Sequence, residues 1–400
     1  MKKLISIITL LCLVVTLFSG CQKAETDTIK IGSIHPLSGS MAEAGSSLVW
    51  AQQIAIDQIN ENGGINGKKL ELVTIDSQGA SNTSATAARK LINQGVVALT
   101  GAYTSGSSQV VSQEAERGKV PFVVTVAASS DLLSRGYEYS FRIQPSVTVF
   151  SKNFITYFNE YIKQNSKDNL KTVALIYENS NYGAGIAGYI KEHIKETGLE
   201  IVGDIPYAST AATLSSEVSK LEKLKPDILI PIGYKNDQTI LINEILSRNI
   251  TFKKVIGVAN GAFSDPDFLK TYGNRVNGYI DINYRYNSNT QKTDEVLEKY
   301  SEKYGKELPV ASIYGYESIM VIADAIKRCE NMSTDEMRKK IAETSITDHI
   351  LPQEKIEFDK TGEDKYAASV MIQIQNGEPV VLYPTEYANE SAKLIEKEEK

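Results

Sequence analysis

Apolar and polar positions follow two alternating patterns along the first third of the chain. Short apolar runs typical of strands occur at 29–34, 70–76, 96–100 and 121–126. Between them, apolar residues recur at helical spacing over 46–60, 81–94 and 107–117. Because strands alternate with helices of about 10–15 residues, the pattern predicts a parallel sheet covered by helices.

The same alternation starts again after Pro145. A long helix predicted over 147–164 is rich in Phe and Tyr on one side. Further strands are predicted at 172–177, 201–205, 228–232 and 254–258, with helices at 186–197, 214–224 and 238–249. The sequence therefore predicts an α/β protein of two units, each with its own mainly parallel sheet. The highly charged tail over 387–400 is predicted to be a frayed helix or disordered.

Composition excludes several classes of protein. Of the 400 residues, 42% are hydrophobic and 23% are charged, which is close to the average of globular proteins. The net charge of −6 is opposite to the basic excess of a nucleic-acid-binding surface, so we expect no nucleic-acid partner. The 3 Cys and 3 His are scattered, and their spacing supports neither a metal site nor a disulfide framework.

Residues 1–20 have the pattern of an export signal. Basic residues at 2–3 precede an apolar run over 4–18, which is shorter than the ~20 residues that span a bilayer. The run ends in Phe-Ser-Gly before Cys21, which resembles a bacterial lipobox. Lipid on Cys21 would hold the protein at a membrane surface, with 21–27 as a tether and a net charge of −8 after cleavage. The alternatives are an ordinary signal peptide and an uncleaved anchor.

Two polar loops at the ends of predicted strands are candidates for a ligand site. In open α/β sheets, ligands bind outside the carboxyl ends of the strands. The segment 101–108 (Gly-Ala-Tyr-Thr-Ser-Gly-Ser-Ser) and the segment 127–131 (Ala-Ala-Ser-Ser-Asp) both lead into helices. Hydroxyls and free N–H groups at a helix N-terminus can hold an anion without Lys or Arg. Together the two loops could hold one carboxylate, although helix capping alone explains the Ser and Gly in either loop.

The chain lacks the common catalytic signatures. It has no Ser in G-x-S-x-G and no phosphate-binding G-x-x-x-x-G-K-[ST]. The segment 183–188 fits G-x-G-x-x-G, but five residues separate it from the preceding strand, whereas a dinucleotide-binding turn follows its strand directly. We therefore expect neither an enzyme nor a bound cofactor.

Several short motifs carry a family resemblance by their order and spacing. In chain order they lie at 31–39, 62–68, 127–130, 135–137, 141–142, 181–183 and 314–317. Over about 28–384 the chain resembles the extracellular solute-binding proteins of ABC importers, in the leucine/isoleucine/valine-binding family with the type I periplasmic-binding fold. The resemblance implies two Rossmann-like lobes joined by a three-segment hinge, which close on a ligand.

The resemblance also implies where the lobes divide. Lobe 1 would contain 28–144 and about 280–352. Lobe 2 would contain about 145–279 and 353–386. The predicted restart of the strand and helix pattern at Pro145 agrees with the first of these boundaries.

The resemblance further implies a set of ligand contacts. Ser105 and Ser129 match family positions that bind a ligand carboxylate, Ser129 through both its hydroxyl and its N–H. Ala127 matches a position that offers its backbone carbonyl to a ligand amine. Three tyrosines would wall the cleft: Tyr103, Tyr182 and Tyr234.

One position departs from the family pattern. Members that bind α-amino acids usually have an acid near the position of Asn260, where it pairs with the ligand ammonium. Because Asn260 carries no charge, a desolvated ammonium would lose its ion-pair partner there. Asp265 or Glu43 could replace that acid. Otherwise the ligand would be a carboxylate without a free amine, such as an aromatic or short-chain acid, or an amide; Ala44, where a large aromatic lid residue is usual, leaves room for a bigger group.

We therefore expect a lipid-anchored, extracytoplasmic, monomeric binding protein. It would capture a small carboxylate-bearing solute, in the first place an amino acid of the branched-chain type, and deliver it to the permease of an ABC transporter. Two alternatives stay open at this point. One is a sensory ligand-binding module for a receptor or regulator, and the other is a secreted enzyme on the same scaffold.

Overall fold

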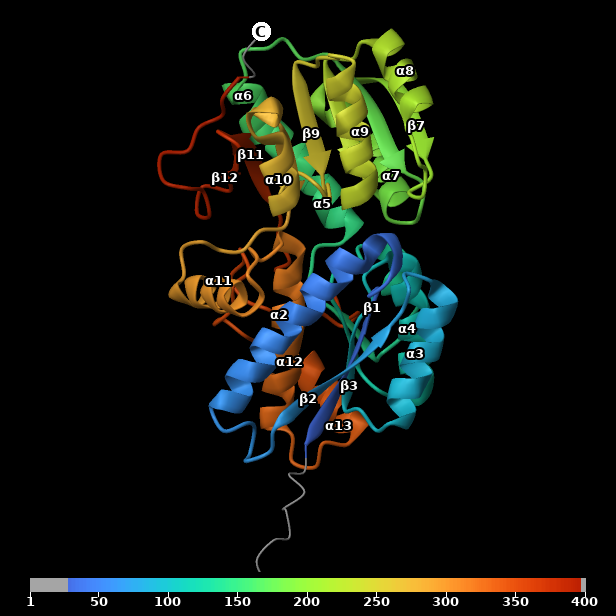
Figure 1. Cartoon of the computed structure of the whole chain (residues 1–400), viewed down its shortest axis with the longest axis vertical. Coiled ribbons are helices and arrows are strands. Elements are labelled where there is room, and N and C mark those ends of the chain that lie inside the picture. Colours follow the sequence, from blue (N-terminus) through green and yellow to red (C-terminus); the bar gives the residue numbers. More distant parts are fainter. Residues whose placement is uncertain (1–27, 397–400) are drawn as a thin grey trace, which may run out of the picture.

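The computed structural model describes residues 28–396, which form two lobes arranged end to end (Figure 1). Each lobe is built around one sheet. The first sheet has the strand order β2-β1-β3-β4-β5, and the second has the order β12-β11-β10-β9-β8-β6-β7. This arrangement confirms the predicted α/β fold class with two Rossmann-like lobes.

Lobe 1 contains an entirely parallel sheet with helices on both faces. Its strands are β1 (Ile29–His35), β2 (Leu70–Asp76), β3 (Ala98–Gly101), β4 (Phe122–Val124) and β5 (Ser140–Arg142). Its main helices are α2 (Ala42–Glu61), α3 (Ser81–Asn93), α4 (Ser105–Gly118), α11 (Gln291–Tyr304), α12 (Ile313–Arg328) and α13 (Thr334–Ala342). One face packs against α2 and α12, and the other against α3 and α4.

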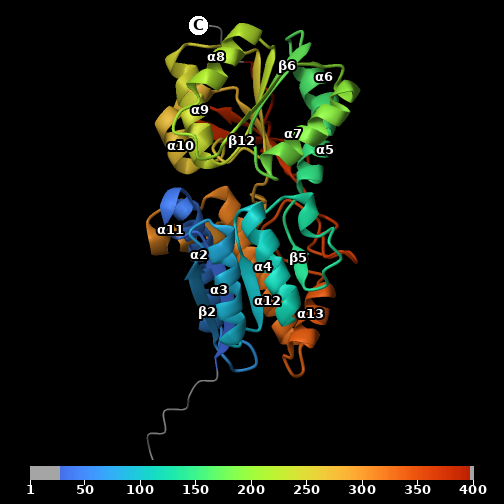
Figure 2. The ribbon, with the colours of Figure 1, turned by 90° about the vertical axis from the view of Figure 1, so that its right-hand side faces the viewer.

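Lobe 2 repeats this plan with an antiparallel extension. Its strands are β6 (Thr172–Glu178), β7 (Glu200–Tyr207), β8 (Ile228–Ile232), β9 (Lys254–Val258), β10 (Ile280–Asn283), β11 (Val370–Gln375) and β12 (Glu378–Tyr383). Its main helices are α5 (Val147–Tyr157), α7 (Gly183–His193), α8 (Ser215–Leu224), α9 (Lys235–Ser247) and α10 (Pro266–Tyr272). Helices α5 and α7 cover one face, and α8, α9 and α10 cover the other (Figure 2).

The long helix predicted at the start of lobe 2 is confirmed, because its sequence supplies both a cap and a buried face. The Ser146 hydroxyl accepts a hydrogen bond from the N–H of Val149 at 3.3 Å, as an N-cap does. The helix continues beyond α5 through a π-helical turn at Phe158–Ile162. Phe150, Phe154 and Phe158 lie four residues apart and are buried against the sheet.

Two predicted lobe boundaries lie later in the chain than expected. Strand β10 pairs with β9, Ile280 opposite Ile256, so it belongs to the sheet of lobe 2 and not to lobe 1. Phe358, assigned to lobe 2, packs against Phe141 in the core of lobe 1. The sequence analysis missed both because it recognised no strand after Val258 and no pairing for the irregular segment around Phe358.

The charged C-terminal segment is neither helical nor disordered as far as residue 396, so that prediction was wrong. Gln373 of β11 exchanges two hydrogen bonds with the backbone of Ile395, at 2.8 and 2.9 Å. The buried ammonium of Lys254 forms ion pairs with Glu396 and Asp168. Glu396 of this segment is therefore an ion-pair partner for lobe 2, which the net charge of the segment alone does not reveal.

Close packing of α2 against α12 generates the first prediction. A Cβ on Gly315 would lie 2.5 Å from the Leu48 carbonyl oxygen, whereas a Cβ on Gly188 in α7 would meet nothing within 4 Å. We expect Gly315→Ala to lower the free energy of unfolding by more than about 1 kcal/mol, because the helices must separate. Gly188→Ala should raise it by roughly 0.5–1 kcal/mol, because Ala favours the helix. Urea denaturation measures both, and equal effects would contradict this account of the packing.

Candidate functional site

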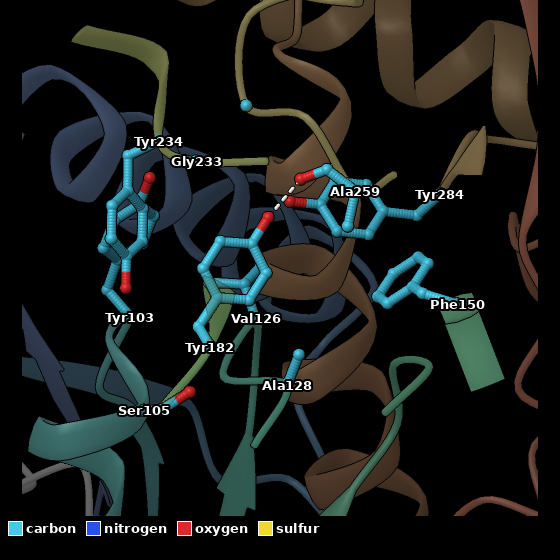
Figure 3. Close-up of a pocket in the computed structure, with 11 residues that line it drawn as sticks. Tyr103, Ser105, Val126, Ala128, Phe150, Tyr182, Gly233, Tyr234, Ala259 and Tyr284 are labelled. Atoms are coloured by element: carbon cyan, nitrogen blue, oxygen red, sulfur yellow. Dashed lines mark hydrogen bonds between the residues drawn. The ribbon is translucent and has the colours of Figure 1, made fainter. Parts of the chain in front are cut away.

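A cavity lies between the two lobes, where the carboxyl ends of strands from both sheets face each other (Figure 3). The unoccupied space in the cavity and at its mouth, with open solvent included, amounts to about 430 Å³. Five of its eleven lining residues are aromatic, and none of the eleven is charged. The lining residues are Tyr103, Ser105, Val126, Ala128, Phe150, Tyr182, Gly233, Tyr234, Ala259, Gly261 and Tyr284.

The structure brings together four of the residues selected from the sequence. Tyr103 and Ser105 reach the cavity from the loop after β3, Tyr182 from the loop after β6, and Tyr234 from the loop after β8. Ala127 and Ser129 are buried beside the lining residue Ala128, but they do not line the cavity themselves. Asn260 lies outside this cavity. The role of each as a ligand contact stays a prediction.

The two serine loops of lobe 1 are joined to each other. Thr104 caps α4 by accepting a hydrogen bond from the Ser107 N–H at 3.2 Å, which places Ser105 at the first position of the helix. The Ser105 hydroxyl accepts a hydrogen bond from the Ser129 N–H at 3.2 Å. The loops therefore form one surface of hydroxyls and N–H groups at a helix N-terminus, which suits an anionic group.

A fully buried arginine holds this surface from behind. Arg142, at the end of β5, donates hydrogen bonds from Nη1 to the carbonyl oxygens of Ala127 and Ser129, at 3.2 and 2.7 Å. Its Nε donates to Glu363 at 2.9 Å, and its Nη2 forms an ion pair with the same carboxylate. The bidentate pair fixes the guanidinium, and the guanidinium holds the loop through its carbonyl oxygens. The Ala127 carbonyl, predicted to meet a ligand amine, is thus already engaged.

The tyrosines of lobe 2 form an aromatic wall opposite the serine loops. The rings of Tyr182 and Tyr234 lie 5.3 Å apart, and Tyr103 of lobe 1 lies 6.1 Å from Tyr234. Phe150 and Tyr284 form an edge-on pair at 5.8 Å on the other side (Figure 3). Burial holds the pKa of the Tyr182 and Tyr234 hydroxyls well above the usual range, so these phenols stay neutral and act as hydrogen-bonding aromatic surfaces.

Two residues that line the cavity have backbone angles that are unusual for residues with a side chain. Tyr103 has φ of +71° and Ala259 has φ of +53°. Residues with a Cβ avoid this region, at a cost of roughly 1–2 kcal/mol. The Tyr182 hydroxyl donates a hydrogen bond to the Ala259 carbonyl, which holds the turn in place. Strained positions that surrounding contacts fix in this way are characteristic of binding sites.

Three buried carboxylates lie behind the aromatic wall. Glu178 accepts hydrogen bonds from the N–H groups of Ser180 and Gly183, and Asp237 accepts one from the Tyr207 hydroxyl at 2.6 Å. The partners of Asp281 are the Asn260 N–H and the Asn283 amide. Within residues 28–396, none of the three forms an ion pair. Their hydrogen-bond donors are all neutral groups. Burial raises the pKa of Asp237 and of Asp281 to about 7.

Asn260 is a structural residue in this conformation. Its side-chain amide donates hydrogen bonds to the Pro231 carbonyl at 3.1 Å and to the Gln238 Oε1 at 2.8 Å. Its side-chain oxygen accepts a hydrogen bond from the Ala262 N–H at 2.9 Å. Every polar atom of the side chain therefore has a partner within lobe 2, and the amide does not point at the cavity.

Glu43 and Asp265, the two acids that could replace an acid at position 260, both form ion pairs with Lys235. Lys235 of lobe 2 lies 3.1 Å from Glu43 of lobe 1 and 2.9 Å from Asp265 of its own lobe. Asp265 also caps α10 by accepting hydrogen bonds from two N–H groups. Beside Lys235, the Asn236 amide donates to the Ser40 carbonyl of lobe 1. These contacts join the lobes at the rim of the cleft, outside the aromatic cavity.

A wider polar cleft continues from the cavity between α2 and α10. Tyr103, Gly261 and Tyr284 line both spaces. Ala44 lines the cleft, together with Glu43, Trp50, Lys306, Asp267 and Asn260. The space predicted beside Ala44 is thus present, and it opens toward solvent.

Seven lining residues were not selected from the sequence. They are Val126, Ala128, Phe150, Gly233, Ala259, Gly261 and Tyr284. Tyr284 directly follows β10, so recognising that strand would have identified it by the carboxyl-end rule. Phe150 lies on a helix whose apolar face was predicted to be core, and periodicity cannot separate a core ring from a cavity ring. The small residues carry no chemical signal of their own.

Residues 28–396 show neither a metal site nor a membrane-spanning helix. No group of three or more His, Cys, Asp or Glu residues in that range is placed to hold a metal ion. In the same range no helix has the length and apolar character needed to span a membrane. Cys21 lies outside the described residues. Cys329 is a free thiol whose sulfur lies 3.4 Å from that of Met337.

Comparison with known proteins gives consistent matches over most of the chain. Residues 28–378 match the family model described as periplasmic binding protein. The chain is 28% identical to Leu/Ile/Val-binding protein homolog 8 of Brucella suis biovar 1 (strain 1330), over 92% of this chain and 94% of that protein. It is 27% identical to homolog 7 of the same organism, over 93% and 95%.

Solved structures with the same fold include proteins crystallised with different ligands. The branched-chain amino acid substrate-binding protein LivJ of Streptococcus pneumoniae, in complex with isoleucine, superposes with a TM-score of 0.79 at 24% identity, covering 92% of this chain and 100% of that one. A solute-binding protein of Rhodopseudomonas palustris BisB5, in complex with 3,4-dihydroxybenzoic acid, has a TM-score of 0.79 at 20% identity, covering 91% and 99%.

The raised pKa of Asp237 generates a prediction about stability and pH. A carboxyl group whose pKa is higher in the folded state stabilises the protein below its unfolded value near 4, and this stabilisation is lost as pH rises to about 7. The loss is up to about 1.4 kcal/mol per pH unit. From pH 5 to pH 8, the free energy of unfolding should decrease less in Asp237→Asn than in the native protein, because the amide of the variant does not titrate.

Urea denaturation at the two pH values measures this difference. Exposed Asp131 provides the matched control, and Asp131→Asn should follow the native protein. The same pH dependence in Asp237→Asn and in the native protein would contradict the assignment of this titration to Asp237.

Proposed function

The chain belongs to the periplasmic binding protein family, and from this premise we propose that it captures a small carboxylate-bearing solute outside the cytoplasm and delivers it to the permease of an ABC transporter. The descriptions of similar solved structures support an ABC transport role, since several are named as substrate- or solute-binding proteins of ABC transporters. In this proposal the protein binds its solute without converting it.

The observation that carries this proposal is the cavity between the lobes. Its lobe 1 side presents the Ser105 and Ser129 loops at the N-terminus of α4, where a carboxylate gains hydrogen bonds and partial positive charge. Its lobe 2 side presents neutral aromatic rings that can cover an apolar or cationic remainder. Neither lobe alone encloses the space, so a ligand that touches both sides favours the closed arrangement.

Closure would follow from this shared contact. A ligand bound between the lobes shifts the equilibrium toward the closed state by its extra affinity for that state. The contacts of Lys235 with Glu43 and of Asn236 with Ser40 would form at the same time, since each joins one lobe to the other. The permease would then recognise the closed surface, and opening would release the solute.

Two ligand classes fit this proposal on different grounds. The relatives named Leu/Ile/Val-binding protein and the isoleucine complex favour a branched-chain amino acid. The absence of any charged side chain from the cavity wall favours a carboxylate without a primary amine, and the dihydroxybenzoate complex has such a ligand. The two classes are separated by direct binding measurements.

We expect a carboxylate from one of these classes to raise the melting temperature without being chemically changed. Thermal shift with leucine, isoleucine, benzoate and short-chain acids or amides identifies it, and calorimetry gives its Kd. Ser105→Ala should then weaken binding roughly tenfold or more, because a hydrogen bond to a charged group is lost. Ser247→Ala, on the exposed side of α9, should leave Kd unchanged. Chemical turnover of the ligand, or equal affinity of the two variants, would refute the proposal.

The lipid anchor is the part of the proposal that concerns residues outside the described range. Lipid on Cys21 would keep the lobes at the membrane that carries the permease, so capture and delivery would occur on one surface. We expect Cys21→Ser to move the protein from the membrane fraction to the soluble fraction after cell lysis. Cys329→Ser is the matched control and should stay with the membranes. Retention of Cys21→Ser would indicate an uncleaved anchor instead.

A further inference from the structure

We propose that the solute held in the aromatic cavity is a betaine-type carboxylate, whose positive charge is a fully methylated ammonium without any N–H group. This inference rests on the proposed capture function and specifies its ligand class. It follows from three features of the cavity: a donor surface on lobe 1, an aromatic surface on lobe 2 backed by carboxylates, and nearby carbonyl and amide oxygens that already accept a hydrogen bond.

The anionic end of such a solute matches the serine loops. The Ser105 hydroxyl and the Ser129 N–H lie within 3.2 Å of each other at the N-terminus of α4. Arg142 holds the carbonyls of Ala127 and Ser129 from behind, and the Ser129 N–H donates to the Ser105 oxygen, so the Ser105 hydroxyl is the side-chain donor that faces the cavity. A carboxylate that accepts from this hydroxyl at the helix N-terminus directs the positive end of the solute toward lobe 2.

The opposite wall has the composition of a site for an alkylated cation. Five aromatic side chains line the cavity, from Tyr103 on one flank to Tyr284 on the other (Figure 3). Ring faces attract a cation through their quadrupole, and such walls are the usual receptors for quaternary ammonium groups. The rings remain neutral, since burial holds the pKa of Tyr182 and Tyr234 well above the usual range.

The charge behind this wall makes the site attractive to a cation and not only to an apolar group. Glu178, Asp237 and Asp281 are buried behind the rings, and their hydrogen-bond partners are all neutral. Gly233 lines the cavity, and a Cβ at this glycine would overlap Asp237 Oδ2, so the carboxylate approaches the wall closely. Within the described residues these acids lack a cationic partner. Because burial raises the pKa of Asp237 and Asp281 to about 7, both are partly protonated near neutral pH, and a cation in the cavity would favour their ionised form.

The hydrogen-bonding state of the wall distinguishes a methylated from a primary ammonium. A primary ammonium leaving water must replace up to three hydrogen bonds, and failure to do so is costly. The Ala127 carbonyl accepts a hydrogen bond from Arg142, and the Ala259 carbonyl accepts one from Tyr182. The Asn260 side-chain oxygen is held by the Ala262 N–H. A methylated ammonium has no N–H to satisfy, so the engaged acceptors do not count against it.

A pair of probes with the same shape and different charge tests the proposal. Glycine betaine and 3,3-dimethylbutanoate differ only in having a positive nitrogen or a neutral carbon at the centre of three methyl groups. Calorimetry should give glycine betaine a Kd at least about tenfold lower than 3,3-dimethylbutanoate, because only the cation gains from the rings and the acids. It should also bind more tightly than glycine, which carries the same charges with three N–H groups.

The outcomes separate this inference from the proposed function. Equal or tighter binding of 3,3-dimethylbutanoate would overturn the inference and leave carboxylate capture standing. Tighter binding of leucine or benzoate than of glycine betaine would do the same. If none of these carboxylates binds, the proposed function fails as well.

Variants of the wall provide a second readout within the folded protein. Tyr234→Leu removes a ring and should weaken glycine betaine binding roughly tenfold relative to Tyr234→Phe, which keeps the ring face. Asp237→Asn should weaken glycine betaine several-fold and should not weaken 3,3-dimethylbutanoate, because only the probe with a positive nitrogen is attracted by the carboxylate. A parallel loss for both probes in Asp237→Asn would overturn the electrostatic part of the argument, and thermal denaturation checks that each variant is folded.

Discussion

The buried guanidinium of Arg142 fixes the parts of lobe 1 on which the cleft depends. It is the last residue of β5, it holds the carbonyls of Ala127 and Ser129, and it pairs with Glu363 from a segment more than two hundred positions later. A buried charge without its partner is strongly destabilising, so the segment around Glu363 has to lie on lobe 1. The chain can return to lobe 2 only after this contact, which explains why the last crossover comes so late.

The two sides of the cavity have complementary electrical character. Lobe 1 contributes a helix N-terminus and N–H groups, and lobe 2 contributes neutral phenols with carboxylates behind them. Closing the lobes places the positive end of one against the negative end of the other, with a layer of rings between them. A solute that has charge of both signs would complete this arrangement, whereas a purely apolar solute would use only the rings.

Much of the fold could be predicted from the sequence because parallel α/β units leave strong local signals. Strand β2 was predicted with its observed bounds, and β6 and α9 were found within a few residues. Strands β10, β11 and β12 were missed because their pairing is decided by neighbours far away in the chain, as Ile280 with Ile256 shows. In the candidate site, the loops after β3 and β4 were identified from the carboxyl-end rule. The engagement of Asn260 and of the Ala127 carbonyl depends on side chains that only the folded structure brings near.

The position of Lys235 has a consequence for how easily the lobes separate. Its ammonium contacts Glu43 across the cleft, and it also contacts Asp265 and Asp267 on its own side. Opening removes one acidic neighbour and leaves two, so no lone charge is exposed by the movement. The rim contact therefore acts as a weak, reversible clasp whose strength depends on ionic strength, and residence time of the solute could be adjusted at Glu43 without altering the lining of the cavity.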